Sequence, residues 1–204
     1  MSLNPVLEST SVDVVFPLEG VFLPRDHAQL LRDALCSQWP MLERENQVGI
    51  HAIKLVSGSD DPAMLSRRTK LLLRVPTLLA AKLLTTQGVD LRVDGQTLRL
   101  GQPHTRELQP HATLYAYQVA ASSADEVAFM ADVTRELASL EIAGERVCGK
   151  HQHMTLSGAV VNTFSLMLHN LRPEQSLRVQ EHGIGPHRLL GCGLFIPHKS
   201  AAAV

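Results

Sequence analysis

In the first hundred residues, short apolar runs alternate with segments whose apolar positions recur at helical spacing. Such patterns predict strands and amphipathic helices in turn. Asp26 is the expected N-cap of the first helix, Pro76 the expected first residue of the second, and Asp94-Gly95 the expected hairpin turn. The elements predicted are a strand over 12–16, a helix over 26–39, strands over 48–53 and 70–75, a helix over 76–88, and paired strands over 89–93 and 97–100.

The second half of the chain repeats the order strand, helix, strand, strand, helix, strand. This order is that of the ferredoxin-like, or split βαβ, arrangement. The elements expected here are a strand over 113–120, a helix over 125–140, strands over 146–154 and 160–168, a helix over 173–182 and a last strand over 194–196. The predicted fold class is therefore α+β, with two tandem ferredoxin-like (RRM-like) domains over residues 1–101 and 111–204. Residues 102–110, which include Pro103 and Pro110, are the expected linker.

Composition narrows the class of protein. The formal net charge of the 204 residues is −1, so an RNA-binding surface would have to be a local basic patch on a near-neutral body. The three cysteines form no C-x-x-C pair, which argues against a disulfide framework and favours a reducing compartment. The N-terminus lacks the layout of a signal peptide, and charged residues and a proline interrupt the most apolar stretch, residues 71–84. We therefore expect a cytoplasmic protein without a membrane segment.

A glycine-rich segment between the last predicted helix and strand carries the most specific signal. Two Gly-x-Gly units enclose five residues that include His187 and Arg188. Glycine allows positive φ and close backbone approach, both suited to gripping a phosphodiester chain, and Arg188 would add a charged fork. A plain helix-to-strand connection needs one or two glycines, and a dinucleotide site has its glycines after a strand rather than after a helix. The expected phosphate contacts are Gly183, Gly185, His187, Arg188, Gly191 and Gly193.

This segment and its flanks resemble the repeat-associated (RAMP) proteins of CRISPR systems. The run Ser176-Leu177-Arg178-Val179-Gln180-Glu181 precedes the glycines, and Leu194-Phe195-Ile196-Pro197-His198-Lys199 follows them. Five further segments are similar to the MYXAN-subtype branch of the CRISPR precursor-RNA endonucleases, the Cas six (Cas6) family. They are Val12-Asp13-Val14-Val15-Phe16-Pro17, Leu23-Pro24-Arg25-Asp26-His27, Gly49-Ile50-His51, Thr113-Leu114-Tyr115-Ala116 and Val147-Cys148-Gly149-Lys150.

The resemblance implies the same tandem fold and an endoribonuclease that cuts CRISPR repeat RNA in precursor transcripts to release guide RNAs. In that family the 2′-hydroxyl beside the scissile phosphate attacks without a metal ion or cofactor, leaving a 2′,3′-cyclic phosphate and a 5′-hydroxyl. Such chemistry needs a base, an acid and positive charge near the phosphorane. The implied partners are the precursor transcript and its guide RNA product, with other subunits of a CRISPR effector complex left open. The alternatives are a non-catalytic RAMP subunit that binds guide RNA and an unrelated ferredoxin-like module that binds a small ligand.

The family's catalytic histidine usually lies in or shortly after the first helix, which implies His51 or His27. We favour His51, which follows the predicted helix, over His27, which lies at its start. The opposing interpretations are a half-buried strand histidine for His51 and a helix-start residue for His27.

Further basic and imidazole side chains are candidates for RNA contact. In an extended strand His151 and His153 point to one face, next to Lys150. A His-x-His pair can bind a metal, but no third or fourth ligand of matching spacing follows, so we expect RNA contact and no metal site. Arg67 and Arg68 are either phosphate contacts or a solvated loop face. Lys199 completes the expected RNA-binding set.

Overall fold

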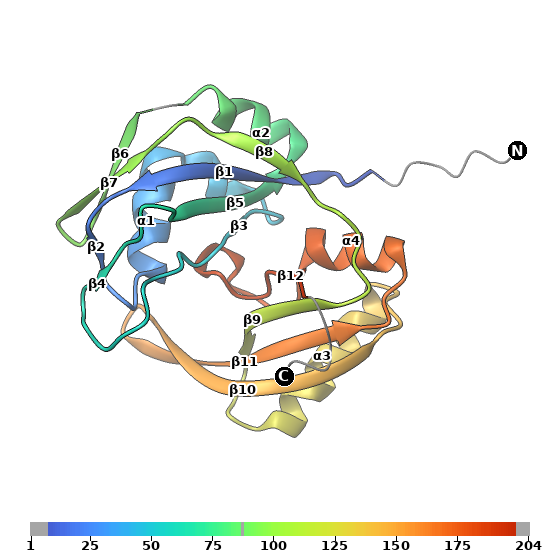
Figure 1. The fold of residues 1–204 in the computed structure, drawn as a ribbon. Helices are drawn as coiled ribbons and strands as arrows, with labels where there is room; N and C mark the ends of the chain where they lie inside the picture. Colours follow the sequence, from blue (N-terminus) through green and yellow to red (C-terminus); the bar gives the residue numbers. More distant parts are fainter. Residues whose placement is uncertain (1–7, 87, 199–204) are drawn as a thin grey trace, which may run out of the picture.

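The computed structural model describes residues 8–86 and 88–198, which form two large antiparallel sheets, one above the other in Figure 1, and a small two-stranded sheet. The first sheet has its strands in the order β3 (Gly49–Ile50), β5 (Lys70–Pro76), β1 (Ser11–Glu19), β7 (Gln96–Leu100) and β6 (Val89–Val93). The second has the order β10 (Glu145–Leu156), β11 (Ala159–His169), β9 (Leu114–Ala121) and β12 (Ile196–Pro197). The first strand of each half lies inside its sheet, as in a ferredoxin-like unit: β1 lies between β5 and β7, and β9 lies between β11 and β12.

Helices pack on one face of each sheet and create two separate cores. The first core joins β1 and β5 to α1 (Ala28–Gln38) and α2 (Thr77–Leu84), with Phe16 stacked on Trp39. The second joins β9 and β11 to α3 (Glu126–Ser139) and α4 (Pro173–His182), with Phe129 stacked on Phe164. The remaining short elements are the two-stranded pair β2 (Phe22–Leu23) and β4 (Ala63–Met64), and the 3₁₀ turns η1 (Pro40–Arg44) and η2 (Arg188–Leu190). None of the helices in the described residues has the length and apolar content needed to cross a membrane.

The segment expected as a linker contains a strand. Residues His104–Glu107 form β8, which pairs with the first part of β1, while β7 pairs with its last two residues. Together, β7 and β8 act as the fourth strand of the first sheet. All four residues of β8 are exposed and polar, so no apolar alternation reveals the strand in the sequence. The domain boundaries stay a prediction, with β8 now part of the first unit.

Several element ends differ from the sequence-based expectation. The N-cap of α1 is His27 rather than Asp26, and Pro76 is the N-cap of α2 because it still pairs with Ser11 as the last residue of β5. Strand β3 is shorter than 48–53, since the Ile53 N–H donates to the His27 ring instead of to a neighbouring strand. The last strand covers Ile196–Pro197 rather than 194–196. The hairpin turn is confirmed: Asp94 and Gly95 both have positive φ, of 48° and 74°.

A buried ion pair joins the two halves of the chain. Asp13 and Arg74 face each other across β1 and β5, on the side of the sheet away from α1 and α2, and both are almost completely buried. Arg74 donates through Nε and Nη2 to the two Asp13 carboxylate oxygens, at 2.9 and 3.3 Å. Its Nη1 donates to the carbonyls of Gln180 and Phe195, at 3.1 and 2.7 Å. One side chain of the first half therefore satisfies backbone acceptors of the second half.

We expect Arg74→Met to destabilise the whole protein. Removing one member of a buried pair leaves an uncompensated charge and typically costs about 3–5 kcal/mol. Denaturant unfolding should therefore show a clearly lower midpoint. Arg99→Met is the matched control, because Arg99 pairs with Asp90 at an exposed site and should leave the midpoint unchanged. Equal midpoints for both variants would contradict the structural role of Arg74.

Candidate active site and RNA-binding surface

The glycine segment, residues 183–193, forms a loop that closes on itself. Gly183 and Gly193 both have positive φ, of 70° and 67°. A Cβ on Gly193 would overlap the backbone of Ile184, and a Cβ on Gly183 would overlap the carbonyl oxygen of Gly193. The two Gly-x-Gly units are thus needed where the ends of the loop meet, because only glycine allows both the conformation and the approach.

The closed loop lies between the two sheets, where the red C-terminal part of the chain crosses the centre of Figure 1. The Gly193 N–H donates to the Gln118 carbonyl of β9 at 2.7 Å. On the other side, a Cβ on Gly191 would lie 3.4 Å from the Ile50 oxygen and 3.5 Å from the Ala52 nitrogen. The loop therefore contacts the backbone on both sides of His51, which makes His51 and the glycine segment parts of one site.

Most N–H groups of the loop already have partners, contrary to the expected row of phosphate donors. The Gly185 N–H donates to both oxygens of the Glu136 carboxylate, at 2.9 and 3.0 Å. The N–H groups of Leu190 and Cys192 donate to the His187 carbonyl, and that of Gly191 to the Arg188 carbonyl. The glycines thus serve mainly to fold the loop, because closing it uses the same N–H groups that a phosphate would need.

Arg188 lies inside the protein rather than on the outside of the loop. The residue is 9% exposed, and its Nη2 donates to the carbonyls of Gln47 and Glu181, at 3.1 and 2.9 Å. Its Nε and Nη1 are buried without a hydrogen-bond partner. Burial, and to a lesser extent the nearby Arg74 charge, lowers the pKa of Arg188 to about 10. The guanidinium therefore stabilises the packing of the two halves against each other. Binding of phosphate by Arg188 stays a prediction.

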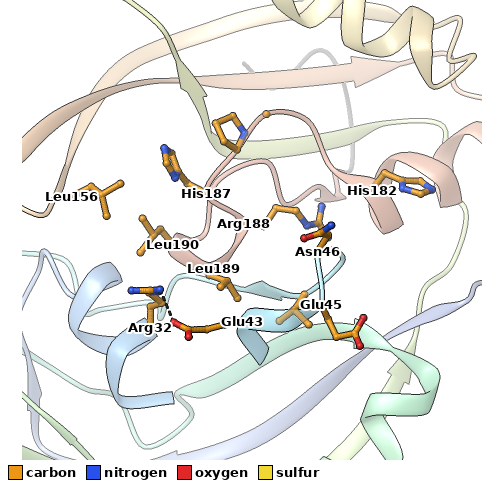
Figure 2. A pocket seen from close by; sticks show the side chains of 13 residues that line it. Arg32, Glu43, Glu45, Asn46, Leu156, His182, His187, Arg188, Leu189 and Leu190 are labelled. Atoms are coloured by element: carbon orange, nitrogen blue, oxygen red, sulfur yellow. Dashed lines mark hydrogen bonds and ion pairs between the residues drawn. The ribbon is translucent and has the colours of Figure 1, made fainter. Parts of the chain in front are cut away.

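A pocket of about 550 Å³ opens between the loop and the first half of the chain (Figure 2). The loop side of the pocket carries His187 and the start of η2, and His182 lies at the end of α4. The opposite side carries Arg32, whose guanidinium is already bonded to Glu43 at 2.6 Å. The pocket is thus lined by the imidazoles of His182 and His187 and by the Arg32 guanidinium, whose charge Glu43 neutralises.

His51 lies beside a cluster of charged groups on β1, β5 and β8. Its Nε2 is 3.7 Å from the Asp13 carboxylate, too far for a hydrogen bond, and is buried without a partner. Asp13 also accepts from Arg106 of β8 at 2.7 Å, and the Arg106 side chain is 56% exposed. Burial lowers the pKa of His51, although Asp13 opposes this effect. Burial therefore favours the neutral form of the His51 imidazole, which can accept a proton, beside an exposed guanidinium.

His27 has both ring nitrogens committed to backbone groups. Its Nδ1 lies 2.9 Å from the Pro24 carbonyl, and its Nε2 accepts from the Ile53 N–H at 3.2 Å. These bonds require the tautomer with the proton on Nδ1. Burial lowers the pKa of His27 as well. Because neither nitrogen is available, the geometry favours His51 over His27 as the base.

Three members of this cluster have no place in the sequence-based prediction: Asp13, Arg74 and Arg106. Asp13 and Arg74 each interrupt an apolar strand, in Val12-Asp13-Val14 and Leu73-Arg74-Val75. A charged residue within an apolar strand could have indicated this cluster, because a buried charge requires a partner. Arg106 lies in β8, the polar strand within the segment expected as a linker, and no local pattern indicates its role.

The other predicted contacts lie elsewhere. The rings of His151 and His153 are 4.8 Å apart, which confirms that they share a face of β10. His151 packs against Phe164, on the α3 side of the sheet, whereas Met154, the next residue after the pair, contacts Cys192 of the glycine segment on the opposite side. Lys150 is exposed at a bulge of β10.

Arg67 and Arg68 are exposed in the turn before β5. Lys199 lies outside the described residues. For these three residues, as for Lys150 and the two histidines of β10, RNA contact stays a prediction.

Comparison with known proteins identifies the family. Residues 12–200 match the family model described as Cas6 Crispr. The chain is 38% identical over 194 residues to the CRISPR-associated endonuclease Cas6 of Myxococcus xanthus strain DK1622, covering 95% of this chain and 84% of that protein.

Solved structures share the fold. A structure named CRISPR associated protein Cas6 has a TM-score of 0.67 at 10% identity, covering 93% of this chain and 100% of that chain. A RAMP protein described as binding different RNA substrates has a TM-score of 0.65 at 10% identity, covering 90% of this chain and 98% of that one. These similarities confirm the tandem ferredoxin-like fold of RAMP proteins, and the match over residues 12–200 together with the 38% identical relative shows that this chain belongs to the Cas6 family.

Proposed function

We propose that this protein is a metal-independent endoribonuclease that cleaves CRISPR repeat RNA in precursor transcripts and so releases guide RNAs. Membership of the Cas6 family and the relative named as an endonuclease support this proposal. The observation that carries it is the position of His51 beside Asp13 and the exposed Arg106, with the glycine segment packed against the neighbouring backbone of Ile50 and Ala52. A candidate base and a positive charge then lie within one site, next to the glycine segment.

In the proposed reaction the 2′-hydroxyl attacks the adjacent phosphate, and the bond to the 5′-oxygen breaks. Asp13 lies nearest to Nε2 of His51 and favours the tautomer with a proton there, which leaves the Nδ1 lone pair to accept the 2′-hydroxyl proton. Arg106 compensates the charge of the phosphorane. The departing 5′-oxygen takes a proton from solvent, and the products are a 2′,3′-cyclic phosphate and a 5′-hydroxyl.

A non-catalytic RAMP subunit that binds guide RNA is the second candidate. The observation in its favour is the burial of His51, whose side chain is only 13% exposed. A base must come within hydrogen-bond reach of its proton, so binding of RNA would have to open access to the ring.

Cleavage should not depend on a divalent metal. We expect the protein to cut RNA transcribed from its own CRISPR repeat at the same rate in EDTA and in magnesium, read on a denaturing gel. A substrate with 2′-deoxyribose at the scissile position should bind but stay intact, because the nucleophile is absent. Loss of cleavage in EDTA, or cleavage of the deoxy substrate, would refute the proposed chemistry.

Replacing the two histidines should have different effects. His51→Ala should lower the single-turnover cleavage rate by about 10²- to 10⁴-fold, with little change in RNA affinity, because it removes the general base. His27→Ala should instead lower the melting temperature, since it removes the backbone contacts to Pro24 and Ile53. A His51→Ala variant that cuts at the wild-type rate would favour the non-catalytic alternative.

The pH profile of cleavage should respond to Asp13. The rate should rise as His51 loses its proton, and because burial lowers the pKa of His51, the rise should be centred below the ordinary histidine value of about 6.5. Asp13 raises the pKa of His51, so Asp13→Asn should move the rise to lower pH and lower the plateau. Asp90→Asn, at an exposed pair, is the control and should leave the profile unchanged. A shift of the Asp13→Asn profile to higher pH would contradict this arrangement.

A further inference from the structure

Both tyrosines of the chain lie together on β9. The ring centroids of Tyr115 and Tyr117 are 5.0 Å apart in an edge-to-face contact, and the His198 ring lies 5.6 Å from Tyr115. Leu114 and Ala116, which alternate with them, are completely buried in the second core. Because side chains alternate along a strand, the two tyrosines belong to the opposite face of the sheet, away from α3 and α4.

Packing does not explain the position of Tyr117, although Tyr115 is half-buried. Tyr117 is 56% exposed, whereas Trp39 and four of the five phenylalanines are buried. Only 4% of the chain is aromatic, yet both of its tyrosines occupy this one face. A bulge turns the strand here, because Tyr117 and Gln118 together oppose the single residue Ser165 of β11. Bulges re-aim side chains, and this one directs Tyr117 outward.

The aromatic group is continuous with the glycine segment. The Gly193 N–H donates to the carbonyl of Gln118, the residue after Tyr117. Gln152 of β10 donates its side-chain N–H to the Tyr117 carbonyl at 3.2 Å. Farther along the same face, the sheet packs directly on the loop, through Ala120, Met154 and Val161 against Leu190 and Cys192. The glycine segment therefore lies next to Tyr117, and Tyr115 lies farther along the same strand.

We infer that Tyr115 and Tyr117, with His198 beside them, form a stacking platform for unpaired bases of single-stranded RNA. This inference rests on the proposed function and adds a site to it. Every base has a π-face, so exposed aromatic rings bind single strands with little regard to sequence. A protein with a net charge of −1 has little bulk attraction for phosphate, and stacking supplies affinity that charge does not. The bases of a duplex are already stacked and cannot occupy the platform.

The test measures binding of a short single-stranded oligoadenylate and, separately, cleavage of the repeat RNA. Tyr117→Ala should bind oligoadenylate about tenfold more weakly, and Tyr115→Ala/Tyr117→Ala more weakly still. Tyr117→Phe should bind like the wild type, whereas Tyr117→Leu, which keeps bulk without a π-system, should not. Val127→Ala is the matched control, since Val127 is 78% exposed on α3. The dependence of affinity on salt should be the same in all variants, because no phosphate contact is removed.

Photocrosslinking provides a readout that does not depend on whether the alanine variants fold. Oligouridylate carrying 5-iodouridine should crosslink the wild-type protein at the peptide containing Tyr115 and Tyr117. Wild-type affinity of the double variant, or crosslinks only elsewhere, would overturn the platform even if the protein cleaves its repeat. Absence of repeat cleavage would refute the proposed function, whereas tyrosine crosslinks would still support the platform. Variants that bind RNA normally but no longer bind another protein would mean that this face is a protein-docking surface.

Discussion

The buried pair of Asp13 and Arg74 is the interaction on which the rest of the structure depends. It joins the two central strands of the first sheet, and the same guanidinium donates to the end of α4 and to the residue before β12. Burial alone would raise the pKa of Asp13, but the ion pair with the Arg74 guanidinium outweighs that effect and holds the pKa well below the usual range. Asp13 also binds Arg106 of β8 and lies next to His51. The ion pair that joins the two halves is thus also part of the candidate active site. A substitution of Asp13 or Arg74 therefore affects both the packing of the halves and the site.

The glycine segment lies beside this contact, because Gln180 and Phe195, whose carbonyls accept from Arg74, flank its two ends. Its two Gly-x-Gly units close a loop whose backbone reaches β9 on one side and the residues around His51 on the other. Arg188 within it is a second buried cation, and its hydrogen bonds go to carbonyl oxygens rather than to carboxylates. Both buried guanidiniums are therefore engaged within the protein and contribute to the contact between the halves. Beside His51, the Arg106 side chain remains accessible, because it is 56% exposed.

The second sheet has two unlike faces. One packs on α3 and α4 and forms an ordinary core, and the His151–His153 pair belongs to that side. The other is covered by the glycine segment over part of its length and presents Tyr117 and Tyr115 beyond it. In the proposed assignment, chemistry takes place between the halves and unpaired bases stack on the open face, with the glycine segment connecting the two.

The sequence by itself determined most of the helices and long strands and the tandem order, because apolar periodicity records which face of each strand or helix is buried. It also determined features that depend on local backbone conformation, such as the turn at Asp94-Gly95 and the glycines at 183 and 193. Only the tertiary structure decided the partners of charged and polar side chains. In the folded protein Asp13, Arg74 and Arg106 form one cluster, and Arg188 is buried. Both ring nitrogens of His27 bond to backbone groups, and four polar residues form strand β8. The physical reason is that burial of a helix or strand face is periodic and visible locally, whereas an ion pair or a hydrogen bond depends on which distant segment packs against it.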